Sequence, residues 1–402
     1  MSEQPYILVI NCGSSSLKFS IINPVNEESL LSGLAECLLL PEAKISWKYK
    51  GEKHQATLPE KANHTDALQF ITEQILIHYP ELKQRIKAIG HRVTHGGEKY
   101  SQPTILTPSV LDDLAALAEL APLHNPANVT GVKAAQVAFP HLKEKNVAVF
   151  DTGFHATLPP QAYLYALPIS YYEKYGIRRY GFHGISHYYI AYKTAEYLGK
   201  PLEDLNMISC HLGNGASITA IKNGQSIDTS MGFTPCEGLV MGTRSGDVDP
   251  ALLIYLKQKL NLSTQQTSDL INKQSGLLGL TNGSSSDFRY ITENYAKDKY
   301  CQIALDVYIH RLVKYIGSYA VLLDNKLDAI VFTGGIGENS ELVRRLVLEK
   351  LTILGFELDQ ERNLAARFGQ NGKITSDQSQ HSAYVIPTNE ELVIAKYTAS
   401  FI

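Results

Sequence analysis

The sequence TGGIGEN, residues 333–339, places three glycines within four residues close to the C-terminus. It follows LDAIVF, an apolar run of strand length at 327–332, and the residues from Ser340 onward have a helical pattern. Glycines at such a turn leave no side chain in the way of a ligand, and a helix N-terminus offers unbonded N–H groups and partial positive charge. The motif therefore predicts a site for an anion or a nucleotide.

Two arginines lie among glycines in segments that read as loops. Arg92 is part of HRVTHGG, which follows an expected strand at 86–90, and Arg244 is part of MGTRSGD. An arginine on a loop at the end of a strand is well placed to hold a carboxylate or a phosphate in a two-point fork. A single arginine of this kind is more often an ordinary surface residue, but two that are flanked by glycine favour anion binding.

Asp151 supplies a carboxylate at the tip of another expected strand. It ends the apolar run VAVF at 147–150 and begins DTGFH, so it lies close to a glycine. Such an aspartate can hold Mg²⁺, orient a nucleophile or take a proton, although capping a turn is its commoner role. Asn11 and Glu390 have the same two interpretations, since Asn11 would otherwise cap a turn and Glu390, in PTNEEL, the final helix.

Four histidines have unusual neighbours: APLHNP surrounds His124, DTGFH ends at His155, YGFHGISH contains His183, and HLGNG begins at His211. A lone histidine is more often structural than catalytic. His183 and His211, however, neighbour glycines at loop positions, where an imidazole can contact phosphoryl oxygens. His183 and His187 have i, i+4 spacing, but the glutamate of an HExxH zinc site is absent, which argues against a metalloprotease.

Composition limits the function classes. With 402 residues the chain is long enough for two or three domains, and its net charge of −3 gives no reason to expect nucleic acid or an anionic membrane as a partner. The five cysteines include no CxxC pair, which argues against a disulfide framework and a zinc site. We see no signal peptide and no apolar run of the ~20 residues that a membrane helix needs, so we expect a cytoplasmic protein.

Strands and helices alternate along most of the chain, as in an α/β protein. Short apolar runs predict buried strands at 6–10, 86–90, 147–150, 207–210 and 329–332. Periodic segments predict helices at 66–78, 109–120, 126–139 with Asn125 as the cap, 186–198, 250–260, 300–323 and 340–354. The segment 300–323 is long and strongly apolar, so we expect it to be a buried central helix.

The chain also contains two segments of similar pattern, which suggests an internal repeat. Residues 7–22 read ILVINCGSSSLKFSII and residues 207–221 read MISCHLGNGASITAI, each a strand, a turn rich in small residues and a second strand. Two ordinary hairpins would look the same. A P-loop, a GxGxxG motif and the protein-kinase motifs are missing, however, so any phosphate cradle must come from such paired hairpins. This requirement points to the architecture of actin, Hsp70 and sugar kinases, in which two related domains clamp ATP.

Longer stretches carry a more specific resemblance. In chain order from residue 11 to residue 392 they are NCGSSSLKFS, GHRVTHGGEKY, APLHNP, VFDTGFHATLP, RRYGFHGISH, HLGNGASI, DTSMGFTPCEGLVMGTRSGDVDP, SGLLGL, SSDFRY, FTGGIGENS and IPTNEEL. Together they cover essentially the whole chain, and they resemble the acetate and propionate kinase family of the sugar-kinase, Hsp70 and actin superfamily.

The resemblance implies reversible phosphorylation of acetate by ATP, which yields acetyl phosphate and ADP and depends on Mg²⁺, with Mn²⁺ as an alternative metal. By motif, it implies that Asn11 and Glu390 hold the metal and that Lys18 reaches a nucleotide phosphate. Arg92 and Arg244 would hold the carboxylate end of the acetyl group. Asp151 resembles the family's catalytic acid or base, and His183 and Arg244 resemble its transition-state stabilisers. The ATP-contacting segments match His211, Leu212, Gly213, Asn214, Gly215, Asp287, Phe288, Arg289, Gly335, Ile336, Gly337, Glu338 and Asn339.

The expected substrate pocket departs from the family at one position. Leu123, Phe182 and Pro235 match the small apolar pocket for the acetate methyl group, but Thr94 stands where acetate kinases often have valine. Threonine has nearly the shape of valine, so the pocket keeps its size, but burying a hydroxyl without a partner costs about 1–3 kcal/mol. We expect acetate as the substrate and propionate as the alternative, because one extra methylene changes discrimination by only about 1–3 kcal/mol.

Elementary chemistry agrees with this assignment. Acetate ionises with a pKa of about 4, so it is already a competent nucleophile at neutral pH and needs no strong base. Asp151 is therefore expected to orient the metal or the substrate rather than to remove a proton. The reaction requires cancellation of the repulsion between two anions, together with in-line positioning, and two arginines, a histidine and Mg²⁺ supply both.

The expected architecture has two duplicated ribonuclease H-like α/β domains with a nucleotide cleft between them. We place the first domain at 1–151 plus 388–402 and the second at 152–387. The family also implies a homodimer, although nothing in the sequence independently indicates an interface. A different class of function, a non-catalytic ATP-driven clamp, shares the fold but does not explain two arginines and an apolar pocket.

Overall fold

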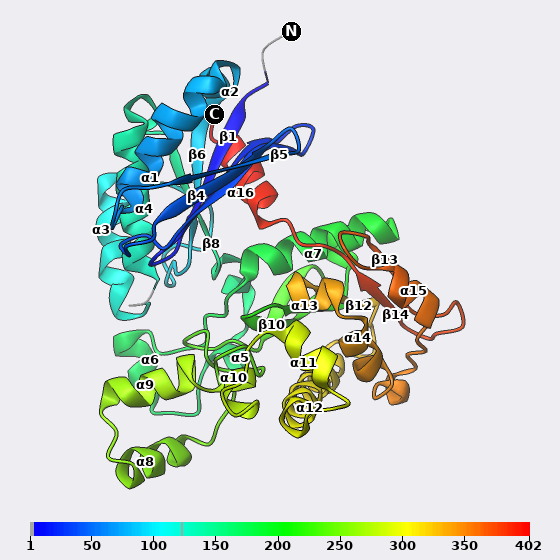
Figure 1. Cartoon of the computed structure of the whole chain (residues 1–402). Coiled ribbons are helices and arrows are strands. Elements are labelled where there is room, and N and C mark those ends of the chain that lie inside the picture. The colour runs from blue at the N-terminus through cyan, green and yellow to red at the C-terminus, as the bar shows by residue number, and fades with distance from the viewer. Residues whose placement is uncertain (1–3, 122–123) are drawn as a thin grey trace. The chain divides into compact units, whose positions relative to one another are not determined.

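Two β-sheets organise the chain in the computed structural model, which describes residues 4–121 and 124–402. Each sheet belongs to one of two units, and the chain passes twice from one to the other (Figure 1). The first unit is Met1–Phe154 with Asn389–Ile402, and the second is His155–Thr388.

The first sheet brings three predicted site residues to one edge. Its strands are β1 (Tyr6–Cys12), β2 (Leu17–Asn23), β3 (Glu28–Glu36), β4 (Lys44–Tyr49), β5 (Glu52–Thr57), β6 (Ile86–Val93), β7 (Thr104–Ile105) and β8 (Asn146–Phe150). Among the described residues their order is β5-β4-β3-β2-β1-β6-β8-β7, and β1, β6 and β8 are parallel. Because parallel strands end at the same edge, Asn11, Arg92 and Asp151 all come to that edge.

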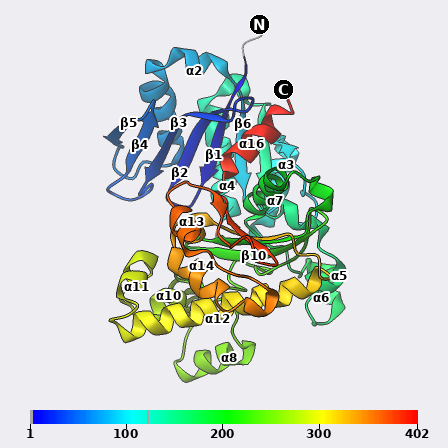
Figure 2. The same ribbon diagram turned by 90° about the vertical axis from the view of Figure 1, so that its right-hand side faces the viewer.

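Helices cover both faces of this sheet (Figure 2). They are α1 (His64–Phe70), α2 (Pro80–Arg85), α3 (Pro108–Ala116), α4 (Asn125–Ala138) and α16 (Glu390–Ala399). Strand side chains alternate between faces, so Leu8 and Ile10 of β1 join the core formed with α1 and α4. Helix α16 packs on the opposite face, close enough that a Cβ added at Gly90 would lie 2.6 Å from Cγ2 of Ile394. This contact holds the middle of α16 against β6.

The second sheet repeats the first. Its strands are β9 (Met207–Leu212), β10 (Ala216–Lys222), β11 (Gln225–Thr229), β12 (Ala329–Thr333), β13 (Gly372–Lys373) and β14 (Ser382–Val385). Within the described part of the chain their order is β11-β10-β9-β12-β14-β13, and β9, β12 and β14 are parallel. The orders β3-β2-β1-β6-β8 and β11-β10-β9-β12-β14 therefore match strand for strand. This topology confirms the duplication that the two hairpins predicted.

The helices of the second unit are α5 (Pro160–Tyr163), α6 (Ile169–Tyr175), α7 (Gly184–Leu198), α8 (Pro250–Lys259), α9 (Thr264–Lys273), α10 (Gly276–Leu280), α11 (Phe288–Asn294), α12 (Lys299–Leu322), α13 (Gly334–Asn339), α14 (Glu341–Leu348) and α15 (Gln360–Ala365). The helix predicted to be buried and central is α12, which packs one face into the core with strands β9 and β10. Its other face is exposed, with Val307, Val321 and Leu322 among the exposed residues, so the prediction of a buried helix was wrong for that face. Helix α7 packs on β9, and Figure 1 places it on the other face of the sheet from α12.

Several predicted element boundaries were wrong. Helix α4 begins at Asn125 itself, whose side chain is buried and bonds to the backbone of His95 instead of capping the helix. The final helix is capped by Asn389, whose Oδ1 accepts from the N–H of Leu392, so Glu390 is not its cap. In both cases a neighbouring residue takes the cap position, because the predicted one is drawn into a tertiary contact or the first helical turn.

The glycine turn also differs from its prediction. An additional short helix, α13, begins inside the motif at Gly334, whose N–H donates to the Glu338 carboxylate at 2.9 Å. The helix predicted from Ser340 onward is α14, with Ser340 as its N-cap. A break at Ser340 then separates α13 from α14, which ends at Leu348. The predicted helix at 66–78 likewise changes at Ile71 into a π turn and then a 3₁₀ turn. Among the described residues, no helix has the length and apolar character to cross a membrane.

Candidate active site

Arg92 and Asp151 form an ion pair at the carboxyl edge of the first sheet. Nη2 of Arg92 donates to Oδ2 of Asp151, and the two side chains are 21% and 1% exposed. Arg92 lies inside β6, which continues past the predicted 86–90 because Arg92 pairs with Val149 of β8. Burial opposes its charge, but the carboxylates of Asp151 and Glu390 raise the pKa of Arg92. A permanent cation is therefore held at this edge.

Glu390 lies in the same recess, which is lined by Val9, Asn11, Lys18, Phe19, Arg92, Glu390, Glu391 and Ile394. Its Oε1 atom is buried and has no hydrogen-bond partner in the parts of the chain that the structure describes. Burial raises the pKa of Glu390, because an ionised carboxyl loses hydration there, while Arg92 and Lys18 act in the opposite direction. Lys18 itself forms an ion pair with Glu391.

These groups fit a Mg²⁺ ion that is only partly ligated by protein. Mg²⁺ prefers one or two carboxylates and completes its octahedron with water and phosphate oxygens. Glu390 offers a buried carboxylate oxygen, and the amide oxygen of Asn11 lies 3.5 Å from Nη1 of Arg92 on the same recess. Among the described residues no group of three or more His, Cys, Asp or Glu side chains is arranged as a metal cage. A metal held here would therefore need ligands from a substrate.

In the second unit, the β9–β10 turn, His183 and Arg244 come together. A Cβ added at Gly215 would lie 3.4 Å from Nη1 of Arg244 and 3.5 Å from Nε2 of His183, so glycine leaves room beside both groups. The N–H of Gly242 donates to the carbonyl oxygen of Asn214 at 2.9 Å, which ties the arginine loop to the hairpin. Burial lowers the pKa of Arg244. The fold thus joins two segments, 207–221 and 241–247, that the sequence presented separately.

A chain of buried side chains supports His183. This residue has a left-handed backbone, with φ of 56°, just before α7. Nδ1 of His183 lies 2.9 Å from Oγ of Ser217, which lies 2.7 Å from Nε2 of His187. Burial holds the pKa of His187 well below its usual value, so this ring stays neutral. The ring of His211 stacks on that of His183 with centroids 4.3 Å apart. The imidazole of His183 is therefore held in one orientation.

His155 has a structural environment. Its Nε2 lies 2.9 Å from the carbonyl oxygen of Phe182, and its Nδ1 lies 2.8 Å from Oγ of Ser226. Burial lowers the pKa of His155 to about 4, so the ring is neutral at pH 7. These two bonds connect the segment that precedes α7 to β11, which positions Phe182. His124 supplies the residue before α4, with no side-chain cap bond to that helix.

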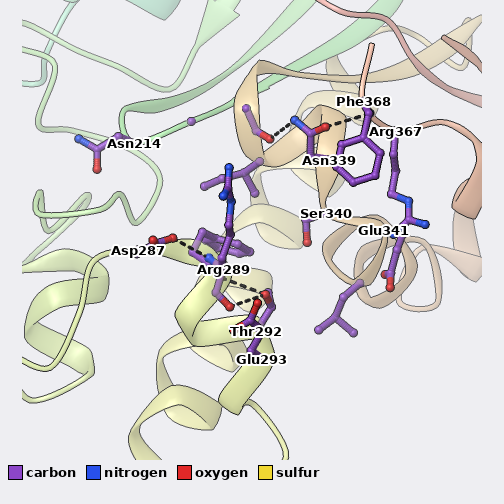
Figure 3. Close-up of a pocket in the computed structure, with 15 residues that line it drawn as sticks. Asn214, Asp287, Arg289, Thr292, Glu293, Asn339, Ser340, Glu341, Arg367 and Phe368 are labelled. Atoms are coloured by element: carbon purple, nitrogen blue, oxygen red, sulfur yellow. Dashed lines mark hydrogen bonds between the residues drawn. The ribbon is translucent and has the colours of Figure 1, made fainter. Parts of the chain in front are cut away.

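The second unit also contains a cavity of about 770 Å³, shown in Figure 3. Its walls come from the β9–β10 turn, the start of α11, helix α13, the start of α14 and the turn at 367–368. Of the predicted ATP contacts, Gly213, Asn214, Asp287, Phe288, Arg289, Gly335, Ile336 and Asn339 line it. Asp287 caps α11 by accepting from the N–H of Arg289 at 2.9 Å. The cavity is large enough for a nucleoside, and its volume lies within the usual range of ligand pockets.

The other predicted ATP contacts lie elsewhere. Leu212 is buried in the hydrophobic core, and Gly337 is buried within helix α13. Glu338 accepts backbone N–H groups of Gly334 and Thr388, which holds α13 against the segment leading to α16. His211 and Gly215 accompany His183 as described, and Lys18 belongs to the first unit.

Several cavity residues escaped the sequence reasoning: Thr292, Glu293, Ser340, Glu341, Leu342, Arg367 and Phe368. Ser340 ends the motif FTGGIGENS, Glu341 and Leu342 follow it directly, and Thr292 and Glu293 follow SSDFRY within three residues, whereas Arg367 and Phe368 belong to no recognised motif. The one available signal was ARFG at 366–369, where an aromatic residue stands beside a glycine in a polar stretch.

The residues predicted to surround the substrate methyl group are divided between the units. Thr94 is buried just after β6, and its N–H donates to Oδ1 of Asn128 at 2.9 Å. Phe182 is buried and Pro235 is half-buried in the second unit. Leu123 lies outside the described residues.

Known proteins match this chain over nearly its full length. The family model described as the acetokinase family matches residues 6–396. Acetate kinase from Photorhabdus laumondii is 58% identical over 393 residues, 98% of each chain, and that from Escherichia coli (strain K12) is 57% identical over 390 residues, 97% of each.

Solved structures of two kinases are also similar to this chain over nearly its full length. A propionate kinase from Francisella tularensis has 42% identity and a TM-score of 0.93, covering 99% of this chain and 100% of its own. Acetate kinase from Porphyromonas gingivalis has 40% identity and a TM-score of 0.92, covering 98% and 99%. The two-sheet α/β fold is thus the actin- and sugar-kinase-like fold that the resemblance implied. From its sequence motifs, its fold and these matches, the chain belongs to the acetokinase family.

Proposed function

We propose that this protein transfers the γ-phosphate of ATP to acetate, reversibly, to give acetyl phosphate and ADP. The observation that carries the proposal is the 57–58% identity to acetate kinases over 97–98% of both chains. Propionate is the alternative acceptor, since a solved relative with 42% identity is a propionate kinase.

The ion pair supports a positioning role for Asp151. Acetate is ionised at neutral pH, so the reaction requires no general base to create its nucleophile. The carboxylate of Asp151 instead fixes the Arg92 guanidinium through Oδ2. Arg92 is then presented as an oriented donor for the acceptor carboxylate, with little conformational freedom to lose on binding.

Arg244 and His183 are proposed to stabilise the transferring phosphoryl group. Their proximity to Gly215 supports this role, because the hairpin turn leaves space for an oxygen-rich group beside both. His183 donates from Nε2 when Ser217 satisfies its Nδ1. Positive and hydrogen-bonding groups of this kind offset the charge on the equatorial phosphoryl oxygens.

Asn11 and Glu390 are proposed to hold Mg²⁺, with Mn²⁺ as the alternative. The buried Oε1 of Glu390 supports this assignment. When bound, the metal would neutralise phosphate charge and leave the electrostatic work on the acceptor side to Arg92. Lys18, which is half exposed, is proposed to reach a nucleotide phosphate by exchanging its ion pair with Glu391.

The 770 Å³ cavity is proposed to hold the adenosine end of ATP. Helix α13 contributes Gly335, Ile336 and Asn339 to its wall, and a Cβ added at the exposed Gly335 would meet nothing within 4 Å. This open glycine surface supports close approach of a ribose or base.

An acyl hydroxamate assay tests the proposal. Purified protein with ATP, Mg²⁺ and hydroxylamine should convert acetate to acetohydroxamate, and omission of Mg²⁺ or ATP should abolish the product. Comparison of kcat/KM for acetate and propionate then separates the two acceptors. A value tenfold higher for propionate would reassign the substrate, and no hydroxamate from any short-chain acid would favour an ATP-driven clamp.

We also propose that the protein is a homodimer. Helix α8 has the sequence PALLIYLKQK, yet none of its residues is buried, and Leu252, Ile254 and Tyr255 are all exposed. Helix α6 likewise exposes Ile169 and Tyr175. Apolar helices without a buried face support coverage by a second copy. Sedimentation velocity should give a mass near twice 44.5 kDa.

A further inference from the structure

The turn at 367–368 has two unfavourable features, a strained backbone and an exposed aromatic ring. Phe368 has a φ of 55°, in the left-handed region that a bulky residue rarely adopts, and its side chain is 79% exposed. Its backbone is strained, and its ring gains little from burial. Phe368 lies at the rim of the 770 Å³ cavity, where Figure 3 shows it beside Asn339. Strain of this kind persists only where the surrounding structure imposes it, and it is concentrated at ligand sites.

Asn339 supplies part of that constraint. Its Oδ1 accepts from the N–H of Phe368 at 3.0 Å, and its Nδ2 donates to the carbonyl oxygen of Gly335 at 2.9 Å. One amide side chain therefore ties the turn to helix α13, and both tied segments line the cavity.

The buried side chain of Arg344 supplies the remaining constraint on this turn. It is completely buried, and its guanidinium donates to five neutral oxygens. Two are the carbonyl oxygens of Gly337 and Glu338 in α13, at 2.8 and 2.9 Å. The others are Oδ1 and the carbonyl oxygen of Asn363, at 2.7 and 2.8 Å, and the carbonyl oxygen of Ala366, at 3.0 Å. Because Ala366 lies two residues before Phe368, Arg344 fixes the spacing between α13 and the turn.

We propose that Phe368 is a stacking surface for the purine base of the nucleotide, held in place by Asn339 and Arg344 as positioning residues; this rests on the proposed function. The guanidinium of Arg367 lies over the Phe368 ring, 5.4 Å from the ring centroid. When a flat base stacks on an exposed aromatic ring at a cavity rim, it removes the face of that ring from water, which stabilises the complex. Such a contact depends on the face of the base, so it adds affinity for the base and none for the phosphates.

Steady-state kinetics provide the first test. Phe368→Ala should raise KM for ATP about 5- to 20-fold, with KM for acetate unchanged and kcat altered by less than about twofold. Phe368→Tyr should restore KM for ATP, since it restores the flat ring. Ile353→Ala is the matched control, because Ile353 is 91% exposed in the same unit and does not line the cavity. An unchanged KM for ATP in Phe368→Ala would overturn the proposal.

Fluorescence gives an independent readout, because Trp47 is the sole tryptophan of the sequence. In a Trp47→Phe background, Phe368→Trp should lose fluorescence on saturation with ADP but not with inorganic tripolyphosphate, which lacks a base. Ile353→Trp in the same background should respond to neither. Adding Arg344→Lys should weaken ADP binding to the Phe368→Trp protein while KM for acetate stays unchanged. No ADP-dependent change at position 368 in an active enzyme would refute the stacking contact.

The two proposals fail differently. If the unmodified protein forms no acyl phosphate from ATP, the proposed function fails, whatever the fluorescence shows. If it is active and Phe368→Ala matches it in KM for ATP, only the stacking contact fails.

Discussion

Replacement of Arg92 by methionine tests the ion pair and the proposed catalytic role together. Methionine keeps most of the side-chain stem but removes the charge that faces the Asp151 carboxylate, which is 1% exposed. Breaking a buried pair by removing one partner costs about 3–5 kcal/mol, because a desolvated charge loses its counter-charge. Arg92 is 21% exposed, so water can partly replace the guanidinium. We therefore expect a loss near the lower end, about 3 kcal/mol of unfolding free energy.

A double-mutant cycle provides the measurement. Urea unfolding of Arg92→Met, Asp151→Asn and the double variant should give a coupling energy of at least about 1.5 kcal/mol, because Asp151→Asn removes the charge that Arg92→Met leaves behind. Arg92→Lys should lose less stability than Arg92→Met, since it keeps a cation. Arg92→Met, Arg92→Lys and the double variant should all show severely reduced turnover. A coupling below about 0.5 kcal/mol would refute the buried-pair interpretation, and near-normal turnover in Arg92→Met would remove Arg92 from the site.

Three further outcomes follow from the same geometry. Glu390→Gln should raise the Mg²⁺ concentration needed for half-maximal rate by about tenfold or more, measured against total Mg²⁺ at fixed ATP; a change in thermal stability alone would make the residue structural. Arg244→Ala should lower kcat/KM by about 10²-fold or more while the far-UV circular dichroism and Tm stay close to the parent values, and a rate within about twofold of the parent would exclude the residue from phosphoryl transfer. Burial lowers the pKa of His91 and His155 to about 4 from 6.5. The unfolded chain therefore binds more protons between these values, and stability should fall as pH drops from about 6.5 to about 4, by up to about 3 kcal/mol for each histidine. His155→Gln should flatten that pH dependence of urea unfolding, and an unchanged slope would contradict the buried neutral ring.

Local pattern was a good guide wherever neighbouring residues decide the conformation. The runs YILVI and AIVF became buried strands β1 and β12, and the apolar segment at 300–323 became the long helix α12, although one face of that helix is exposed. Small-residue turns between apolar runs predicted both hairpins, because strand and turn signals there act within about ten residues. Strands β3, β4 and β5 were not predicted, since residues 28–57 mix polar and apolar positions on a half-exposed part of the sheet.

Boundaries and caps failed for a common reason. Asn125 is a residue type that often caps helices. Here its side chain instead hydrogen-bonds to the backbone of His95, 30 residues earlier in the chain. Glu338 accepts the N–H of Gly334 and so begins a helix inside a motif that reads as a flexible glycine turn. In each case a tertiary or short-range polar contact overrides propensity, which contributes at most about 1 kcal/mol per residue.

The order of the motifs along the chain determined the family, the repeated hairpins and the kinds of chemistry available, because these depend on residue types and short-range spacing. The tertiary structure alone decided which polar atoms lose contact with water: the Arg92 guanidinium against Asp151, the Oε1 atom of Glu390, and Arg344 beneath the strained turn of Phe368. Burial depends on segments that lie far apart in the sequence. The electrostatic strength of each group depends in turn on its burial.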